Sequence, residues 1–224
     1  MQHRLFGFTA LWLILILLTL SCGSGTKQLY DGPDRIGYVI SDDFETNELY
    51  GWECYPYAQD IGYDPDTACM SEPTHNGSGF ALARIVKPND VLDLSQGFTK
   101  QIDLWTTQST RLKCAVYFVS DRKPEKVEIM LGLFDGRLFT HIIDAPDANS
   151  WVEIDLPASE FTIDGNPLGP GEHVQVVAVK GYYPQVSHLI SYTILMDDFS
   201  INGDRNRCFV GVNPSSIWFG KFGI

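Results

Sequence analysis

The chain has 224 residues, with 28 acidic and 16 basic side chains and a formal net charge of −12. That length is enough for one domain with its own core. An acidic surface repels nucleic acid at long range, so we expect no nucleic-acid partner, and it argues more weakly against a polyanionic polysaccharide.

The N-terminus predicts an exported, lipid-anchored protein. Arg4 gives a basic start, an apolar run follows from residue 5 to residue 20, and small residues surround Cys22. The stretch LTLSC resembles the bacterial lipobox, with Thr19 and Leu20 departing from its usual pattern. The resemblance implies that residues 1–21 are a signal peptide and that Cys22 carries palmitate or other acyl chains. Residues 22–35 would then hold a flexible tether in the bacterial cell envelope, on a periplasmic or outer membrane surface. An ordinary secreted protein and a retained membrane anchor are the alternatives.

Strand patterns dominate from residue 36 onward, and no window has a helical period over three turns. Asp135-Gly136 predicts a two-residue type I′ hairpin between two of the strands. We therefore predict an all-β fold, an antiparallel β-sandwich (jelly roll) over residues 36–203, followed by a tail over 204–224. The strand-like runs, rich in β-branched and aromatic residues, are Gly79–Ile85, Arg111–Val119, Lys126–Phe134, Arg137–Ile143, Trp151–Leu156, His173–Tyr183 and Ile190–Ile201.

The tripeptide Asp-Asp-Phe occurs twice, at Asp42–Phe44 and at Asp197–Phe199. We expect the two stretches to be the first and last strands of the sandwich. Asp-Phe-Glu followed by Gly51-Trp52 at the opening, and Asp-Asp-Phe at the close, resemble the galactose-binding-like carbohydrate-binding modules of bacteria. The likeness covers about residues 36–203 and extends to the N-terminal sandwich of bacterial polysaccharide lyases.

The resemblance implies a structural calcium ion held by Asp43, Glu45 and Asp198, with Asp42 and Asp197 pointing to the opposite face. The alternative is that these aspartates end strands because they accept hydrogen bonds from turn amides.

Cysteine pairing is open in an exported chain. Cys54 and Cys69 flank a turn-rich aromatic loop, so a disulfide between them is one possibility and free thiols are the other. Cys114 alternates with apolar residues of a strand, so we expect a small buried hydrophobe there.

We expect no catalysis. Glu153 and Asp155 share a strand face, as the carboxylates of laminarinase-type enzymes do, but Pro157 ends that strand before Glu160. The four histidines after the signal peptide show no metal-ligand spacing.

Aromatic side chains in loop sequence predict the ligand surface. Sugars are bound by flat aromatic rings with polar groups beside them. The expected function is non-catalytic binding of a polysaccharide or oligosaccharide. An accessory module of a polysaccharide lyase and a protein-binding scaffold lipoprotein are the alternatives. The residues expected to contact the sugar are Tyr55, Tyr57, Gln59, Asp60, Tyr63, Tyr182 and Tyr183.

Overall fold

The computed structural model describes residues 35–55, 66–76, 79–86, 95–183 and 192–206. The expected signal peptide, Cys22, the expected tether up to residue 34 and the residues beyond 206 lie outside these ranges. Within them, no helix is long and apolar enough to cross a membrane.

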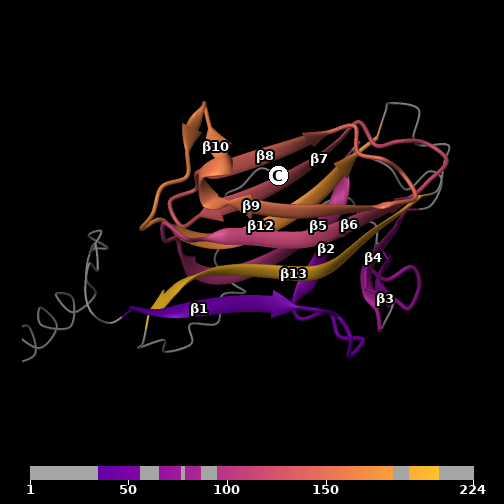
Figure 1. Cartoon of the computed structure of the whole chain (residues 1–224), viewed down its shortest axis with the longest axis horizontal. Helices are drawn as coiled ribbons and strands as arrows, with labels where there is room; N and C mark the ends of the chain where they lie inside the picture. Colours follow the sequence, from indigo (N-terminus) through magenta and orange to yellow (C-terminus); the bar gives the residue numbers. More distant parts are fainter. Residues whose placement is uncertain (1–34, 56–65, 77–78, 87–94, 184–191, 207–224) are drawn as a thin grey trace, which may run out of the picture. The chain divides into compact units, whose positions relative to one another are not determined.

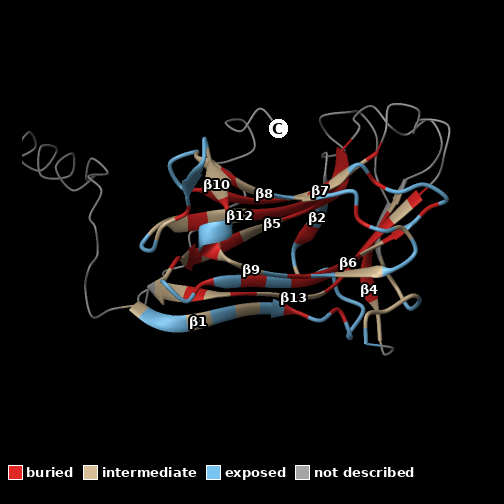
Figure 2. Ribbon diagram, turned by 45° about the horizontal axis from the view of Figure 1, so that its top comes forward, coloured by how far each residue is buried: buried red, intermediate tan, exposed pale blue. Residues whose placement is uncertain are grey.

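The described residues fold into two packed layers of antiparallel strands (Figures 1 and 2). This confirms the predicted all-β sandwich. The helical turn that the described residues contain is a 3-10 turn, η1 (Ala158–Glu160).

The first layer is a sheet whose strands pair in the order β8-β7-β12-β5-β2. Two short strands extend it beyond β8. The strands are β2 (Trp52–Tyr55), β5 (Ser95–Trp105), β7 (Lys126–Leu133), β8 (Leu138–Asp144), β10 (Thr162–Ile163), β11 (Asn166–Pro167) and β12 (His173–Tyr182).

The second layer is built around the long strand β13. On one side β13 pairs with β6, which pairs with β9. On the other side its first half pairs with β4 and its second half with β1, and β3 pairs with β4. The strands are β1 (Arg35–Asp42), β3 (Asp66–Met70), β4 (Ala81–Val86), β6 (Arg111–Val119), β9 (Trp151–Pro157) and β13 (Tyr192–Asn206).

The first and last described strands carry the two copies of the tripeptide, as expected, and they pair with each other. Asp42 in β1 stands opposite Phe199 in β13, and the antiparallel register runs on to Arg35 and Asn206. A single further pair, Asp204 with Trp105, links β13 to β5 in the first layer.

Alternation along the strands fills the core between the layers. In β6, Leu112, Cys114, Val116 and Phe118 are all buried, as their period predicted. Trp52 is also buried and packs edge-on against Phe199, with ring centroids 4.9 Å apart. A fully buried side chain of this size contributes about 1.5–3 kcal/mol to stability. Figure 2 shows the buried stretches running along both layers, whereas β1 at the margin is largely exposed.

The β7–β8 hairpin forms where Asp135-Gly136 predicted it, but its turn is not type I′. A type I′ turn needs positive φ at both central residues. Gly136 has a φ of 92° and Asp135 is not among the residues with positive φ. Backbone bonds from Gly136 N to Leu133 O and from Leu133 N to Arg137 O close a longer loop, in which glycine supplies the left-handed residue.

Candidate functional site

One candidate surface lies on the outer face of the first layer, at the end of β12. The hydroxyl of Tyr182 donates to Oε2 of Glu128 at 2.7 Å, and the ammonium of Lys126 lies 4.2 Å from the centroid of the Tyr182 ring. β12 and β7 bring these side chains together, because Tyr182 pairs across the sheet with Lys126 and Lys180 pairs with Glu128. Tyr182 was expected from the sequence. Its two partners were missed, because only the β7–β12 register places them beside it.

Tyr183 does not belong to that surface. It is fully buried, its ring lies 3.9 Å from that of Tyr192, and burial raises its pKa above the ordinary value. Consecutive residues of a strand point to opposite faces, so Tyr183 turns inward where Tyr182 turns outward. The expectation that one of the two tyrosines faces outward is confirmed, and the assignment of Tyr183 to the ligand surface is wrong.

The remaining predicted contacts lie largely outside the described residues. Tyr55 ends β2 and its backbone pairs with Gly97 in β5, but its side chain is not described. Tyr57, Gln59, Asp60 and Tyr63 fall in the range 56–65. A common platform of these residues with Tyr182 therefore stays a prediction.

The opposite end of the same face carries a stack of rings that the sequence did not suggest. The Trp105 ring stacks on His173 at 4.6 Å, and His173 stacks on Phe134 at 5.7 Å. The guanidinium of Arg35 lies 4.1 Å from the Trp105 centroid. These rings cover one another's faces, although Phe134 remains 58% exposed. Between the two ends, Thr99, Ala178 and Lys180 are buried.

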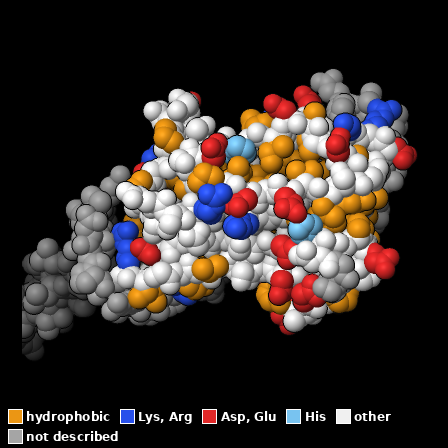
Figure 3. Space-filling model, in the orientation of Figure 1, with side chains coloured by type: hydrophobic (Ala, Val, Ile, Leu, Met, Phe, Trp, Pro, Cys, Tyr) orange, Lys and Arg blue, Asp and Glu red, His pale blue; other side chains and the backbone are white. Residues whose placement is uncertain are grey.

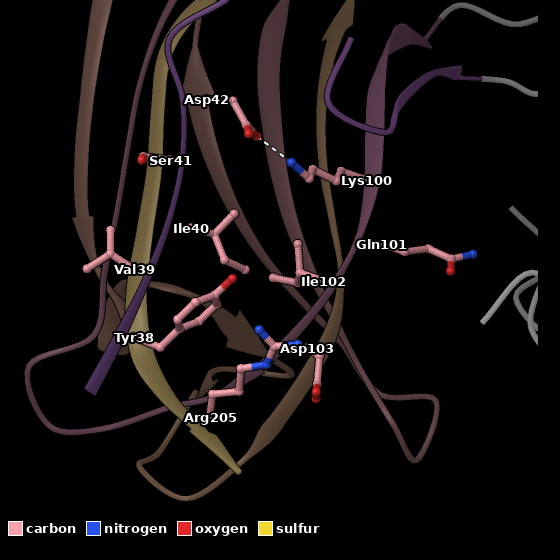
Figure 4. Close-up of a pocket in the computed structure, with 10 residues that line it drawn as sticks. All are labelled: Tyr38, Val39, Ile40, Ser41, Asp42, Lys100, Gln101, Ile102, Asp103 and Arg205. Carbon is pink, nitrogen blue, oxygen red and sulfur yellow. Dashed lines mark hydrogen bonds and ion pairs between the residues drawn. The ribbon is translucent and has the colours of Figure 1, made fainter. Parts of the chain in front are cut away.

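A second candidate site is a pocket of about 360 Å³ in the open side of the sandwich, between β1 and β5 (Figure 4). These two strands do not pair with each other. β1 pairs with β13, and β5 pairs with β2 only from Gly97 to Lys100. Figure 4 shows side chains of β1 pointing toward β5, with neighbouring residues of both strands pointing away. Those pointing into the pocket include Tyr38, Ile40, Asp42, Lys100 and Ile102.

The inner end of this pocket holds a buried ion pair. The ammonium of Lys100 lies 2.5 Å from Oδ2 of Asp42, and the indole N–H of Trp52 donates to the same oxygen at 2.9 Å. Asp42 is 6% exposed. Asp42 was expected to point away from the calcium ligands, and Lys100 and Trp52 are the two partners that satisfy its charge.

A third feature is an acidic cluster around the second Asp-Asp-Phe. Asp197 is buried and accepts bonds from the backbone N–H groups of His75, at 3.0 Å, and Asp198, at 2.8 Å. Burial raises the pKa of Asp197, and the nearby charges of Asp198 and Glu45 raise it further. The carboxylate of Asp198 is bound by the His75 ring at 2.7 Å and by the Asn76 amide. Figure 3 shows acidic side chains gathered around a histidine on the side where β3, β4 and the loop after β1 lie.

This cluster alters the expected calcium ligand set. Asp197 faces the same cluster as Asp198 and Glu45, so its assignment to the opposite face is wrong. Asp43 is exposed, and its Oδ1 accepts from the Glu45 N–H at 3.3 Å, as a turn aspartate does. No group of three or more His, Cys, Asp and Glu side chains in the described ranges has a metal-binding arrangement. A calcium ion here would need main-chain carbonyls and water among its ligands, so calcium stays a prediction.

The proposed disulfide is not formed. Cys69 is a free thiol whose Sγ donates to the carbonyl of Glu48 at 3.7 Å. Cys69 pairs with Leu82 in β4 of the second layer, whereas Cys54 pairs with Phe98 in β5 of the first. The two cysteines thus belong to different layers.

The carboxylates of β9 contact side chains of neighbouring residues in the fold. Glu153 and Asp155 both face outward, as predicted. Asp155 is paired with Arg111 at 2.8 Å and with Lys113 at 3.4 Å, and hydrogen bonding to Arg111 holds the pKa of its carboxyl below the ordinary value. Glu153 lies 3.3 Å from the His75 ring, and Glu160 lies in η1, beyond the strand.

The protein resembles solved structures of other proteins in its fold. No protein-family model matches the chain, and no curated protein matches it. A solved structure of endo-1,4-β-D-xylanase 10B from Clostridium thermocellum, comprising its CBM22-1 and GH10 modules with xylohexaose, is 14% identical with a TM-score of 0.50. The match covers 77% of this chain and 30% of that one. The family 11 carbohydrate-binding module from Clostridium thermocellum, in complex with a β-1,3-1,4-mixed-linked tetrasaccharide, is 18% identical with a TM-score of 0.47, over 75% of this chain and 95% of that one. The sandwich described above therefore has the kind of fold found in carbohydrate-binding modules.

Proposed function

We propose that this protein binds a polysaccharide or oligosaccharide without chemically changing it, through the outer face of the first layer around Tyr182. The observation that carries the proposal is the grouping of a half-buried tyrosine ring with a carboxylate at its hydroxyl and an ammonium over its face. Sugars offer apolar C–H faces rimmed with hydroxyls, and such a site supplies both apolar contact and hydrogen bonds. The fold is consistent with this role, because the xylanase structure of similar fold includes a module of this kind.

Lipidation at Cys22 would hold the module on a membrane of the bacterial envelope. Its physical task would be to raise the local concentration of glycan there, for uptake or for a glycan-degrading enzyme such as a polysaccharide lyase. Substituting Cys22 by Ser should release the protein from the membrane fraction or leave its precursor uncleaved. Labelled fatty acid that never appears on the wild type would contradict the anchor.

We also propose that calcium stabilises the loop that follows β1. Glu45 and Asp198 remain candidate ligands, and buried Asp197 adds a third carboxylate close by. A cation would relieve the repulsion among these charges. Melting of the protein with and without a calcium chelator tests this step.

A glycan array on soluble residues 29–224 tests the binding itself, and three alanine variants locate it. Tyr182→Ala should weaken retention of the bound glycan by about 1–3 kcal/mol with little loss of stability. Phe134→Ala, an exposed aromatic at the other end of the same face, is the matched control and should leave retention unchanged. Tyr183→Ala should instead cost about 3–5 kcal/mol of folding free energy, because that ring is buried. An array that retains no glycan, or retention that is the same for Tyr182→Ala and the wild type, would contradict the proposal.

A further inference from the structure

The pocket between β1 and β5 is separate from the surface around Tyr182. It opens at the side of the sandwich, where β1 and β5 do not pair with each other, and Tyr182 is not among the residues that line it. Its volume of about 360 Å³ falls within the range of roughly 300–1,000 Å³ that small-molecule sites occupy.

The lining combines an apolar middle with polar ends. Tyr38 and Ile40 from β1 stand across the opening from Ile102 of β5, as Figure 4 shows. The Asp42–Lys100 pair closes the inner end. At the other end Arg205 of β13 packs over the Tyr38 ring at 5.0 Å, and Asp103 lines the same end.

The buried ion pair is hard to explain by folding alone. Replacing a buried pair by apolar side chains of similar volume is often neutral or stabilising, so such a pair is weak evidence of a stabilising role. Here the pair borders an open pocket and presents an ammonium and a carboxylate to whatever enters it. A ligand with hydroxyl groups could accept from the one and donate to the other.

The charge of the whole chain favours a neutral ligand. Within the lining, Asp42 is paired with Lys100, and Asp103 is paired with His173 at 2.6 Å on the outer face of the sheet. The whole chain carries a formal charge of −12, which opposes the approach of an anion. A uronate would bring a further negative charge to this acidic chain, whereas a neutral polyol would meet the ammonium of Lys100 as a donor and the carboxylate of Asp42 as an acceptor.

We propose that this pocket is a second carbohydrate site, which takes a single neutral pyranose ring such as the end of a glycan chain. The ring's apolar face would lie against Tyr38, Ile40 or Ile102, and its hydroxyls would reach Lys100 and Asp42. The inference rests on the proposed function for its ligand class, but it uses residues that the Tyr182 surface does not contain.

Backbone amide NMR titration of residues 29–224 tests it, with methyl glycosides of glucose, galactose and mannose as neutral probes and methyl glucuronide as the anionic one. At least one neutral glycoside should shift resonances of β1 and β5, and the glucuronide should bind about tenfold more weakly or not at all.

Tyr38→Ala should weaken binding of the neutral glycoside about tenfold, as removal of a binding aromatic does. Val39→Ala is the matched control, because its side chain points away from the pocket and is 58% exposed. Ile40→Phe, which narrows the pocket without removing a charge, is a second variant in case Tyr38→Ala does not fold. Melting curves identify any variant that fails to fold.

The outcomes separate this inference from the proposed function. Tyr182→Ala should leave the monosaccharide shifts in β1 and β5 intact. Three results would overturn the pocket: no neutral glycoside shifts β1 and β5, Tyr38→Ala and Ile40→Phe bind like the wild type, or the glucuronide binds best. Glycan-array binding that persists alongside any of these results would leave the proposed function standing without the second site.

Discussion

The two copies of Asp-Asp-Phe have the same residues, but the charges of their buried aspartates are stabilised by different partners. In each copy the first aspartate is buried: Asp42 is 6% exposed and Asp197 is 2% exposed. Asp42 meets a cation and an indole N–H, whereas Asp197 meets two backbone N–H groups. Phe199 and its counterpart Phe44 are both in the core.

Position in the sheet accounts for the difference. The first copy ends β1, where the open side of the sandwich brings Lys100 of β5 within reach. The second copy lies within β13 at a bulge between Asp197 and Ser200, and Asp198 there has a φ of 50°. A bulge re-aims side chains locally, and here both aspartates contact the segment around His75. Identical tripeptides therefore do not imply a shared ligand, and each carboxylate has to be judged by the groups around it.

The largest expected effect is at the first copy. Asp42→Ala leaves Lys100 buried without its carboxylate and removes the acceptor of the Trp52 indole. Breaking a buried pair from one side costs about 3–5 kcal/mol of unfolding free energy. Urea denaturation of the purified variant measures the loss.

The matched control is the double variant Asp42→Ala with Lys100→Met, which removes both charges. It should recover most of the lost stability, because the penalty comes from the unpaired charge rather than from the missing contact. A double variant no more stable than Asp42→Ala would show that the carboxylate acts through something other than Lys100.

Calcium binding would distinguish the two copies most directly. If the second copy and Glu45 hold calcium, added calcium should stabilise the folded state by about 2.7 kcal/mol at one hundred times its dissociation constant, and chelation should reverse the effect. Asp198→Ala should abolish the response and Asp42→Asn should not. Calorimetric melting with and without chelator measures it, and curves indifferent to chelator would leave hydrogen bonding as the whole role of these carboxylates.

The second aspartates of the two copies give a smaller contrast. Asp198 is bound by the ring of His75 and the amide of Asn76, but its side chain is 40% exposed. In chelator-containing buffer, Asp198→Ala should cost roughly 1 kcal/mol, since partial exposure weakens such pairs. Asp43 is exposed with one turn hydrogen bond, so Asp43→Ala should fall within about 0.5 kcal/mol of the wild type. Equal losses in urea denaturation would remove the distinction between the two positions.

Local pattern in the sequence predicted the strands and the two-layer fold, because alternation and turn residues act over a few positions. The repeated tripeptide predicted which stretches form the first and last strands. Neither the local pattern nor the tripeptide predicted which distant strands pair and in what register. The partners Lys126 and Glu128 of Tyr182, the approach of Lys100 to Asp42, and the placement of Cys54 and Cys69 in separate layers all depend on which strands pair and at what offset.

The bulge explains why the expected direction of Asp197 is wrong. Strict alternation predicts that Asp197 and Asp198 point to opposite faces, as it does for Asp42 and Asp43. The positive φ of Asp198 breaks that alternation in β13 and lets the two carboxylates share one cluster. No residue in the tripeptide distinguishes the bulged copy from the other one.

Cys114 offers the smallest and most local test of the second copy. In β6, Lys113 pairs with Ser200 and Ala115 with Asp197, so Cys114 stands opposite the bulge. It is buried, and burial raises the pKa of its thiol to about 12 from the ordinary value of 9.0.

A folded thiol with a raised pKa keeps its proton when the unfolded chain has lost it. Its contribution to stability is therefore complete well below pH 9, begins to fall as the pH approaches 9, and continues to fall as the pH rises toward 12. From pH 8 to pH 9 the wild type should lose about 0.4 kcal/mol more than Cys114→Ala, measured by urea denaturation at each pH. Iodoacetamide should leave Cys114 unmodified in the folded protein at pH 8.5, because the thiolate is the reactive form. Parallel pH profiles for the two proteins, or rapid alkylation of Cys114 under native conditions, would mean that the core opposite the bulge opens readily. The second Asp-Asp-Phe would then be held less firmly than its hydrogen bonds indicate.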